Sequence, residues 1–172
     1  MTAQAKNHPQ PDERAIFTQP SEFETQMTRI FRGSPEKLFH IYNDPGTIPL
    51  IWDPDPTKVT VETLDFRVGG RFSIAVRGEG DSTSRFMGEF LQIIPGRRTV
   101  VRWHASNRPD SPVVETDDFE PVGSFTKVTI RWQHVSHEGR DRMAGPAFES
   151  LMNEQSARID ELLSTSNAER RR

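Results

Sequence analysis

Five side chains in this sequence have types and spacing that could build a metal or catalytic site. His134 and His137 have two residues between them near the end of a predicted strand, and His104 lies on another strand. Zinc usually takes three or four converging ligands, so a chain without cysteine would also need Asp117 or Asp118. Nothing in the spacing brings such a set together, and no serine nucleophile motif accompanies the histidines. We therefore expect no metal and no cofactor, and we assign no catalytic residue.

A charged cluster around two glycines is the second candidate. Asp65, Arg67 and Arg71 surround the pair Gly69-Gly70, between two runs of alternating apolar residues. Such a pattern is typical of a β-hairpin, because glycine tolerates the positive φ of a tight turn. A functional cluster is the alternative, but the turn alone explains the motif if the aspartate pairs locally and the arginines face solvent. No helix follows the glycines, which excludes a phosphate-binding loop.

Apolar and aromatic residues on the predicted strands are the most informative set. Phe72 and Ile74 share one face of a strand, and Val101 and Trp103 share one face of another. These side chains could line a cavity, or they could fill the packed core that any such domain needs. If a cavity exists, its lining is expected to be Phe39, Trp52, Phe72, Ile74, Trp103, Trp132, Phe148, Leu151 and Met152.

Alternating apolar residues predict the strands that hold these side chains. The predicted strands cover residues 23–31, 59–62, 72–76, 85–94, 99–104, 113–116 and 127–132. From residue 59 onward short turns join consecutive strands, which implies an antiparallel sheet with one apolar face in need of a cover.

Two helical segments complete the predicted elements, and the short apolar run 47–52, which contains a proline, predicts at most one further helical turn. Ser34-Pro35-Glu36 is a strong helix start, since serine caps free N–H groups, proline fits the first turn and glutamate suits the positive end of the dipole. After Gly145-Pro146, apolar residues recur at steps of three and four as far as Leu163, which predicts a helix about 27 Å long. The fold class is therefore α+β, with a curved antiparallel sheet of about six to seven strands wrapped around a long C-terminal helix.

Composition excludes several classes of protein. The 172 residues suit one domain, and a formal net charge of -3 lacks the basic footprint of nucleic-acid or anionic-membrane binding. Without cysteine there is no disulfide framework. No apolar run approaches the ~20 residues that span a bilayer, and the N-terminus lacks the apolar core of a secretory signal. We expect a soluble cytoplasmic protein, a monomer or weak dimer, with no nucleic-acid or membrane partner.

The expected domain covers residues 21–165. Residues 1–20 are polar and interrupted by prolines, which predicts a flexible N-terminal tail, with a partner-binding arm as the alternative. Residues 166–172 are expected to form a flexible C-terminal tail.

The order of elements resembles the START/Bet v 1-like (SRPBCC) superfamily with its helix-grip fold. The motifs resemble its branch related to the C-terminal domain of the Hsp90 ATPase activator. They are the run from Thr28 through Ser34-Pro35 to Phe39, then Asp44-Pro45, then Asp65-Phe66-Arg67-Val68-Gly69-Gly70-Arg71-Phe72. The chain departs from that pattern at Ile51-Trp52, where relatives often have two tryptophans, and at Phe148, where they often have Gly-Trp. The resemblance implies an apolar cavity between the sheet and the long helix, and it leaves the ligand open.

Three functions stay open after this comparison. The first is binding of a small apolar or amphipathic ligand in the cavity, with Arg102, His104 or Tyr42 free to orient it. The second is a cyclase- or hydrolase-like enzyme that uses His104, His134 or an acid inside the cavity. The third is a chaperone-partner module, which needs an exposed binding face. We rank them in this order, with a binding protein favoured over an enzyme.

Overall fold

The computed structural model describes residues 14–169, which form eight strands, four α-helices and one 3-10 turn. The strands are β1 (Ile16–Ser21), β2 (Glu24–Phe31), β3 (Val59–Leu64), β4 (Arg71–Arg77), β5 (Thr83–Ile94), β6 (Arg98–Ala105), β7 (Val113–Val122) and β8 (Phe125–His134). The helices are α1 (Pro35–Asn43), α2 (Ile48–Trp52), α3 (His137–Arg142) and α4 (Pro146–Glu169), and the 3-10 turn is η1 (Pro56–Lys58).

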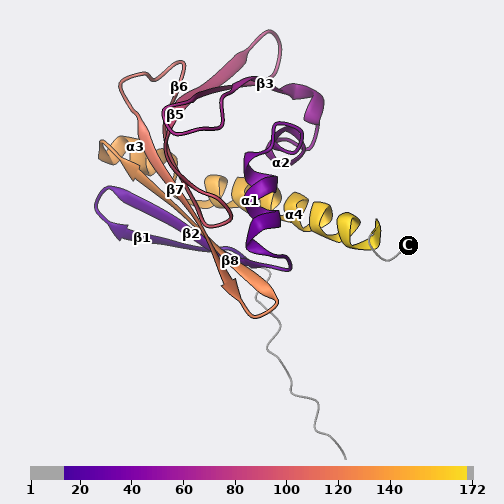
Figure 1. Ribbon diagram of the computed structural model, residues 1–172. Helices are drawn as coiled ribbons and strands as arrows, with labels where there is room; N and C mark the ends of the chain where they lie inside the picture. Colours follow the sequence, from indigo (N-terminus) through magenta and orange to yellow (C-terminus); the bar gives the residue numbers. More distant parts are fainter. Residues whose placement is uncertain (1–13, 170–172) are drawn as a thin grey trace, which may run out of the picture.

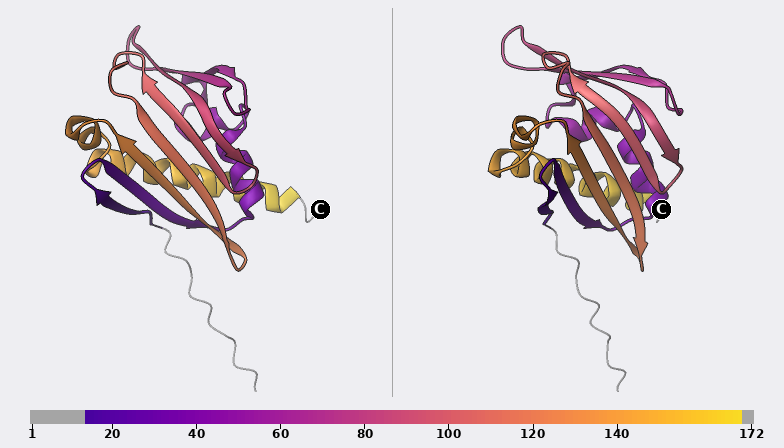
Figure 2. Two further views of the ribbon diagram at one scale, coloured as in Figure 1. Left: turned by 60° about the vertical axis from the view of Figure 1, so that its left-hand side comes forward. Right: turned by 90° about the vertical axis from the view of Figure 1, so that its left-hand side faces the viewer.

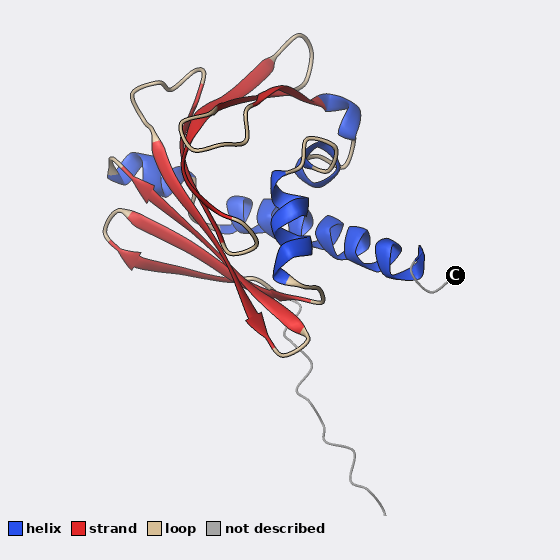
Figure 3. Ribbon diagram, viewed as in Figure 1, coloured by secondary structure: helices blue, strands red, loops and turns tan. Residues whose placement is uncertain are grey.

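All eight strands join in one antiparallel sheet, in the order β1-β2-β8-β7-β6-β5-β4-β3. Helix α4 runs along one side of this sheet, and α1 and α2 lie on the same side (Figures 1 and 3). Figure 2 shows the sheet curving around that side. The α+β helix-grip fold is therefore confirmed, with eight strands in place of the six to seven expected.

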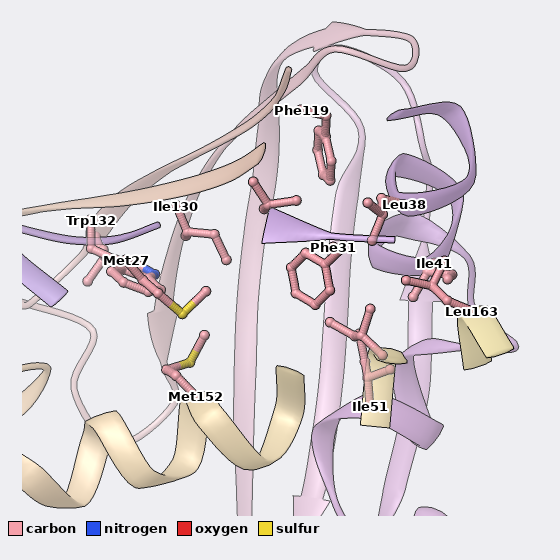
Figure 4. Close-up of a cluster of buried hydrophobic side chains, with 13 residues drawn as sticks. Met27, Phe31, Leu38, Ile41, Ile51, Phe119, Ile130, Trp132, Met152 and Leu163 are labelled. Carbon is pink, nitrogen blue, oxygen red and sulfur yellow. The ribbon is translucent and has the colours of Figure 1, made fainter. Parts of the chain in front are cut away.

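Strict alternation along the central strands decides which side chains face α4. In β8 the even-numbered residues from Thr126 to His134 are buried. They pair with odd-numbered residues of β7, which in turn pair with odd-numbered residues of β6, so the odd-numbered side chains of both strands face α4. Opposite them, α4 buries Met152, Ile159 and Leu163 at helical spacing. Figure 4 shows Met27 of the sheet and Met152 of the helix pointing toward each other within this core.

Helix α1 forms where the sequence predicts it. The Ser34 hydroxyl accepts a hydrogen bond from the Lys37 backbone N–H at 3.3 Å, and Pro35 occupies the first helical position. The helix ends before Asp44, whose carboxylate accepts hydrogen bonds from the N–H groups of Gly46 and Thr47. The next turn leads directly into α2, which contacts both α4 and β3.

The hairpin between β3 and β4 has the predicted turn chemistry. Gly69 has φ +78°, and a Cβ at Gly70 would lie only 1.9 Å from the Asp65 carbonyl oxygen. The backbone of the two glycines pairs with Phe90 of β5. Arg67 forms an ion pair with Asp65 at 2.9 Å with both side chains largely exposed, so the charges belong to the turn, as expected.

The structure changes the predicted tails at their inner ends. Residues 16–20 were expected in a flexible tail, but Ile16–Ser21 pairs with β2 as the eighth strand. Only one residue of this edge strand, Phe17, is partly buried. The other positions can therefore be polar or proline, and the sequence shows no strand pattern there. Residues 166–169 continue α4 instead of starting a tail. The rest of both predicted tails, residues 1–13 and 170–172, lies outside the described residues.

Candidate functional site

Five aromatic residues form two groups of ring contacts along the helix-facing side of the sheet. We call them the aromatic band. Trp52 of α2 meets Phe86 of β5 with 5.6 Å between ring centroids, and Phe86 meets Trp103 of β6 at 5.9 Å. Trp132 of β8 meets Phe148 of α4 at 5.2 Å. The two halves of the band are separated by a single strand, β7.

Glu115 of β7 connects the two halves of the aromatic band. Its Oε2 atom accepts hydrogen bonds from Trp103 Nε1 and Trp132 Nε1, each at 2.8 Å. Burial raises the pKa of the Glu115 carboxyl above its ordinary value, although the two indole N–H groups act in the opposite direction. The residue faces the inside of the fold and is only partly buried as a whole.

Asp117 lies two residues further along β7 and points to the same side of the sheet. We call Glu115 and Asp117 the acidic pair. Thr99 donates its hydroxyl to Asp117 Oδ2 at 3.2 Å, whereas Oδ1 has no hydrogen-bond partner within residues 14–169. Burial, reinforced by the Glu115 charge, raises the pKa of Asp117 well above its ordinary value. Burial, followed by the charge of Asp117, also raises the pKa of Tyr42, whose buried hydroxyl has no partner in the described chain.

The nearby arginines are engaged elsewhere. Arg29 of β2 forms an ion pair with Asp160 of α4 at 2.5 Å, and its side chain is 5% exposed. Arg158 donates Nε–H to the Ile51 carbonyl oxygen at 3.0 Å. These contacts fix α4 to β2 on one flank and to α2 on the other.

One hollow of about 240 Å³ opens between the start of α4 and the β1–β2 edge of the sheet. We call it the edge pocket. Trp132 and Phe148 of the aromatic band form part of its wall, together with Phe17, Met143 and the Glu149 carboxylate. This volume suits a small aromatic molecule or one end of a longer ligand, because drug-sized sites begin near 300 Å³.

A larger hollow of about 680 Å³ lies on the opposite side of the sheet, lined by Arg71, Ser73, Met87, Arg102 and His104 among others. The hypothesis that Arg102 and His104 orient a ligand in the cavity beneath α4 is therefore wrong. Odd-numbered residues of β6 face the helix, so these even-numbered ones face away, and Arg102 forms an ion pair with Glu89 on the outer side.

Most of the expected cavity residues do lie on the helix-facing side, in two adjoining clusters. Trp132 and Met152 belong to the main core, against which Phe39, Trp103 and Phe148 pack. Ile74 and Phe72 belong to a second cluster, and Trp52 contacts both. Leu151 is the exception, since it is 50% exposed while the neighbouring Met152 takes the inward position on α4.

The predicted histidines do not converge. His134 is buried and bonds Thr25 Oγ1 at 3.0 Å, whereas His137 pairs with Glu22 on the surface at 2.6 Å. His104 lies on the outer side of the sheet, and no group of three potential ligands for a metal occurs among the described residues. Glu115 was not predicted as a site residue. The available signal was its place two residues after Val113 in a predicted strand, which puts both side chains on the same face.

Helix α4 covering the aromatic, helix-facing side of a curved antiparallel sheet is the arrangement that defines a helix-grip protein. The part of the chain from residue 32 to residue 164 matches the family described as "Activator of Hsp90 ATPase homolog 1-like protein". This protein belongs to that family. No helix in the described part of the chain is long and apolar enough to cross a membrane.

Solved structures with the same fold come from several bacteria. A crystal structure of a Rhodobacter sphaeroides protein is similar with a TM-score of 0.79 and 19% identity, over 88% of this chain and 99% of that one. A solution structure of an Arthrobacter aurescens protein has a TM-score of 0.74 and 22% identity, over 91% and 92%. CalU16 from Micromonospora echinospora has a TM-score of 0.58 and 18% identity, over 86% and 82%. At these identities the likeness shows the fold alone. No curated protein matches the sequence.

Proposed function

We propose that this protein binds a small apolar or amphipathic molecule between the helix-facing side of the sheet and α4. The observation that carries the proposal is the exposure of the aromatic band. Trp52, Phe86, Trp103 and Phe148 all point to the covered side of the sheet, yet each stays only partly buried. These rings leave apolar surface next to the core that a ligand could bury, because aromatic side chains dominate the apolar area of ligand sites as they do that of cores.

The edge pocket supports the same proposal. It adjoins the aromatic band at Trp132 and Phe148, so a ligand end placed there would contact the band directly. Polar residues also line the pocket, among them Thr25 and Glu149, and they would suit the polar end of an amphipathic molecule.

Thermal shift with a panel of aliphatic and aromatic small molecules tests the proposal. A ligand at a hundred times its Kd stabilises the folded state by about 2.7 kcal/mol. For a chain of this size that corresponds to a rise in Tm of about 5–10 °C. Failure of every member of the panel to raise Tm would contradict the proposal.

A matched pair of variants separates the two sides of the sheet. Phe86 faces the helix and belongs to the aromatic band, while the adjacent Met87 lines the outer hollow. We expect Phe86→Ala to abolish the ligand-induced shift and Met87→Ala to preserve it. The opposite result would move the binding site to the outer side of the sheet.

Acid–base catalysis in the same space is the second candidate, in the form of a cyclase- or hydrolase-like enzyme. The acidic pair favours it, since two carboxyls with raised pKa values on one strand face suit a general acid and a general base near neutral pH. Its test is hydrolysis of a panel of p-nitrophenyl esters. Activity that falls about a hundredfold in Glu115→Gln would support catalysis, and equal rates in both proteins would exclude it for these substrates.

Contact with an Hsp90-type chaperone is a third proposal, and it rests on the family alone. Co-purification with such a chaperone and a change in its ATPase rate on addition of this protein would support it. The absence of both effects would rule against it.

A further inference from the structure

The acidic pair has no counter-charge within the described chain. Neither Glu115 nor Asp117 forms an ion pair anywhere in residues 14–169. Arg29 is paired with Asp160, and Arg158 donates to the Ile51 carbonyl oxygen, so neither contacts the acidic pair. Buried carboxylates normally occur with a cation or become protonated, because an isolated charge in the interior is costly. The interior can therefore accept positive charge that the described chain does not supply.

Glu115 is placed to receive that charge. Both indole N–H groups bond the same oxygen, Oε2, which leaves Oε1 available to a further donor. Glu115 as a whole residue is only partly buried, in contrast to the buried Asp117. An ammonium group at this position would form a charge-assisted hydrogen bond, which is about twice as strong as a neutral one.

Aromatic rings stand on both sides of Glu115. Trp103 lies against Phe86 on one side, and Trp132 lies against Phe148 on the other. The two tryptophans turn their N–H edges toward Glu115, so their rings offer apolar surface beside the carboxylate for the chain that an ammonium group carries. An anionic ligand would instead be repelled by the acidic pair.

We propose that the ligand of this protein is a cationic amphiphile, an aliphatic or aromatic amine whose ammonium group binds Glu115 while its apolar part lies along the aromatic band. This inference rests on the proposed binding function and specifies the class of ligand. The second carboxyl, Asp117, lies on the same face of β7 and is given no direct contact with the ammonium group.

Three probes that share one linear apolar chain test the proposal: decylamine, decanol and decanoate. Titrations below their micelle concentrations, followed by calorimetry, give a Kd for each. We expect decylamine to bind about tenfold more tightly than decanol, the difference between a charge-assisted and a neutral hydrogen bond. Decanoate should bind more weakly than either.

The decisive variant is Glu115→Gln, which keeps an acceptor for the indole groups and removes the charge. It should lower the affinity for decylamine to that for decanol and leave decanol unchanged. Glu120→Gln is the control, because Glu120 lies on the same strand but is exposed and pairs with Lys127. A circular dichroism spectrum checks that each variant folds. If Glu115→Gln does not fold, the preference of the unaltered protein for decylamine over decanol decides the question.

The outcomes separate this inference from the binding function itself. Equal affinity for decylamine and decanol would overturn the amine assignment while leaving the binding function intact. A preference for decylamine that persists in Glu115→Gln would also overturn it, since the charge would then be recognised elsewhere. A panel in which no apolar molecule binds would refute both.

Discussion

The ion pair between Arg29 and Asp160 leads to an asymmetric prediction about stability. The two side chains differ sharply in exposure, 5% for the arginine and 43% for the aspartate. The guanidinium also lies over the Phe31 ring at 4.6 Å and has Nε and Nη1 without hydrogen-bond partners in the described chain. Removing the aspartate leaves a buried, unpaired cation, whereas removing the arginine leaves a carboxylate that water can solvate.

The expected costs follow from that difference. Breaking a buried pair by deleting one partner usually costs about 3–5 kcal/mol. We expect about 2–3 kcal/mol for Asp160→Ala, because this carboxylate is partly exposed and alanine favours the helix. Arg29→Met fills the space of the arginine stem and should cost about 1 kcal/mol or less. The double variant should resemble Arg29→Met, since no unpaired cation remains.

Urea unfolding followed by far-UV circular dichroism at neutral pH measures these differences. The Asp160→Ala loss should also appear as a fall in Tm of about 4–12 °C. Glu161→Ala, at an exposed position of the same helix, controls for the change in helix propensity. A cost for Arg29→Met equal to or above that of Asp160→Ala would refute the reasoning.

Three further predictions concern single positions. Because the pKa of Asp117 is raised in the folded state, that state binds the proton more tightly than the unfolded chain. Its contribution to stability is complete below the ordinary carboxyl pKa near 4 and is lost as pH rises through the folded value. Asp117→Asn should flatten the fall in unfolding free energy that begins as pH rises above about 4. Gly70→Ala should cost more than about 3 kcal/mol, because the added Cβ would collide with the Asp65 carbonyl oxygen. Gly69→Ala, strained only in φ, should cost about 1 kcal/mol by urea unfolding. Tyr42→Phe should be neutral or stabilising by up to about 1 kcal/mol, since the hydroxyl that it removes has no partner in the described chain, and a lower urea midpoint would contradict this.

The fold could be predicted because strict alternation survives in the central strands β2 and β8. In β8 each inward residue from Thr126 to His134 alternates with an outward one, and pairing then imposes the same alternation on β7 and β6. Strand β1 was not predicted, because this edge strand places only one side chain, Phe17, partly in the interior and so shows no apolar alternation.

The candidate site was predictable only in part. The aromatic residues carried a clear signal. The same alternation that places Val101 and Trp103 on one face of β6 places Arg102 on the other, so its outward direction was open to prediction. The predicted strand from residue 113 ended at Thr116, since aspartate disfavours strands. In the structure β7 continues through Asp117, which places that carboxyl on the covered side.

Strand β1 has one further consequence, for how copies of this protein meet. Strand β1 is the end strand of the sheet, so backbone N–H and C=O groups along its free edge could pair with an extended segment of another chain. Pro20 has no N–H to offer, and the pairing register shifts between Thr18 and Ser21. Pro20, which made the strand hard to predict from the sequence, thus removes a hydrogen-bond donor from the free edge and opposes edge-to-edge aggregation.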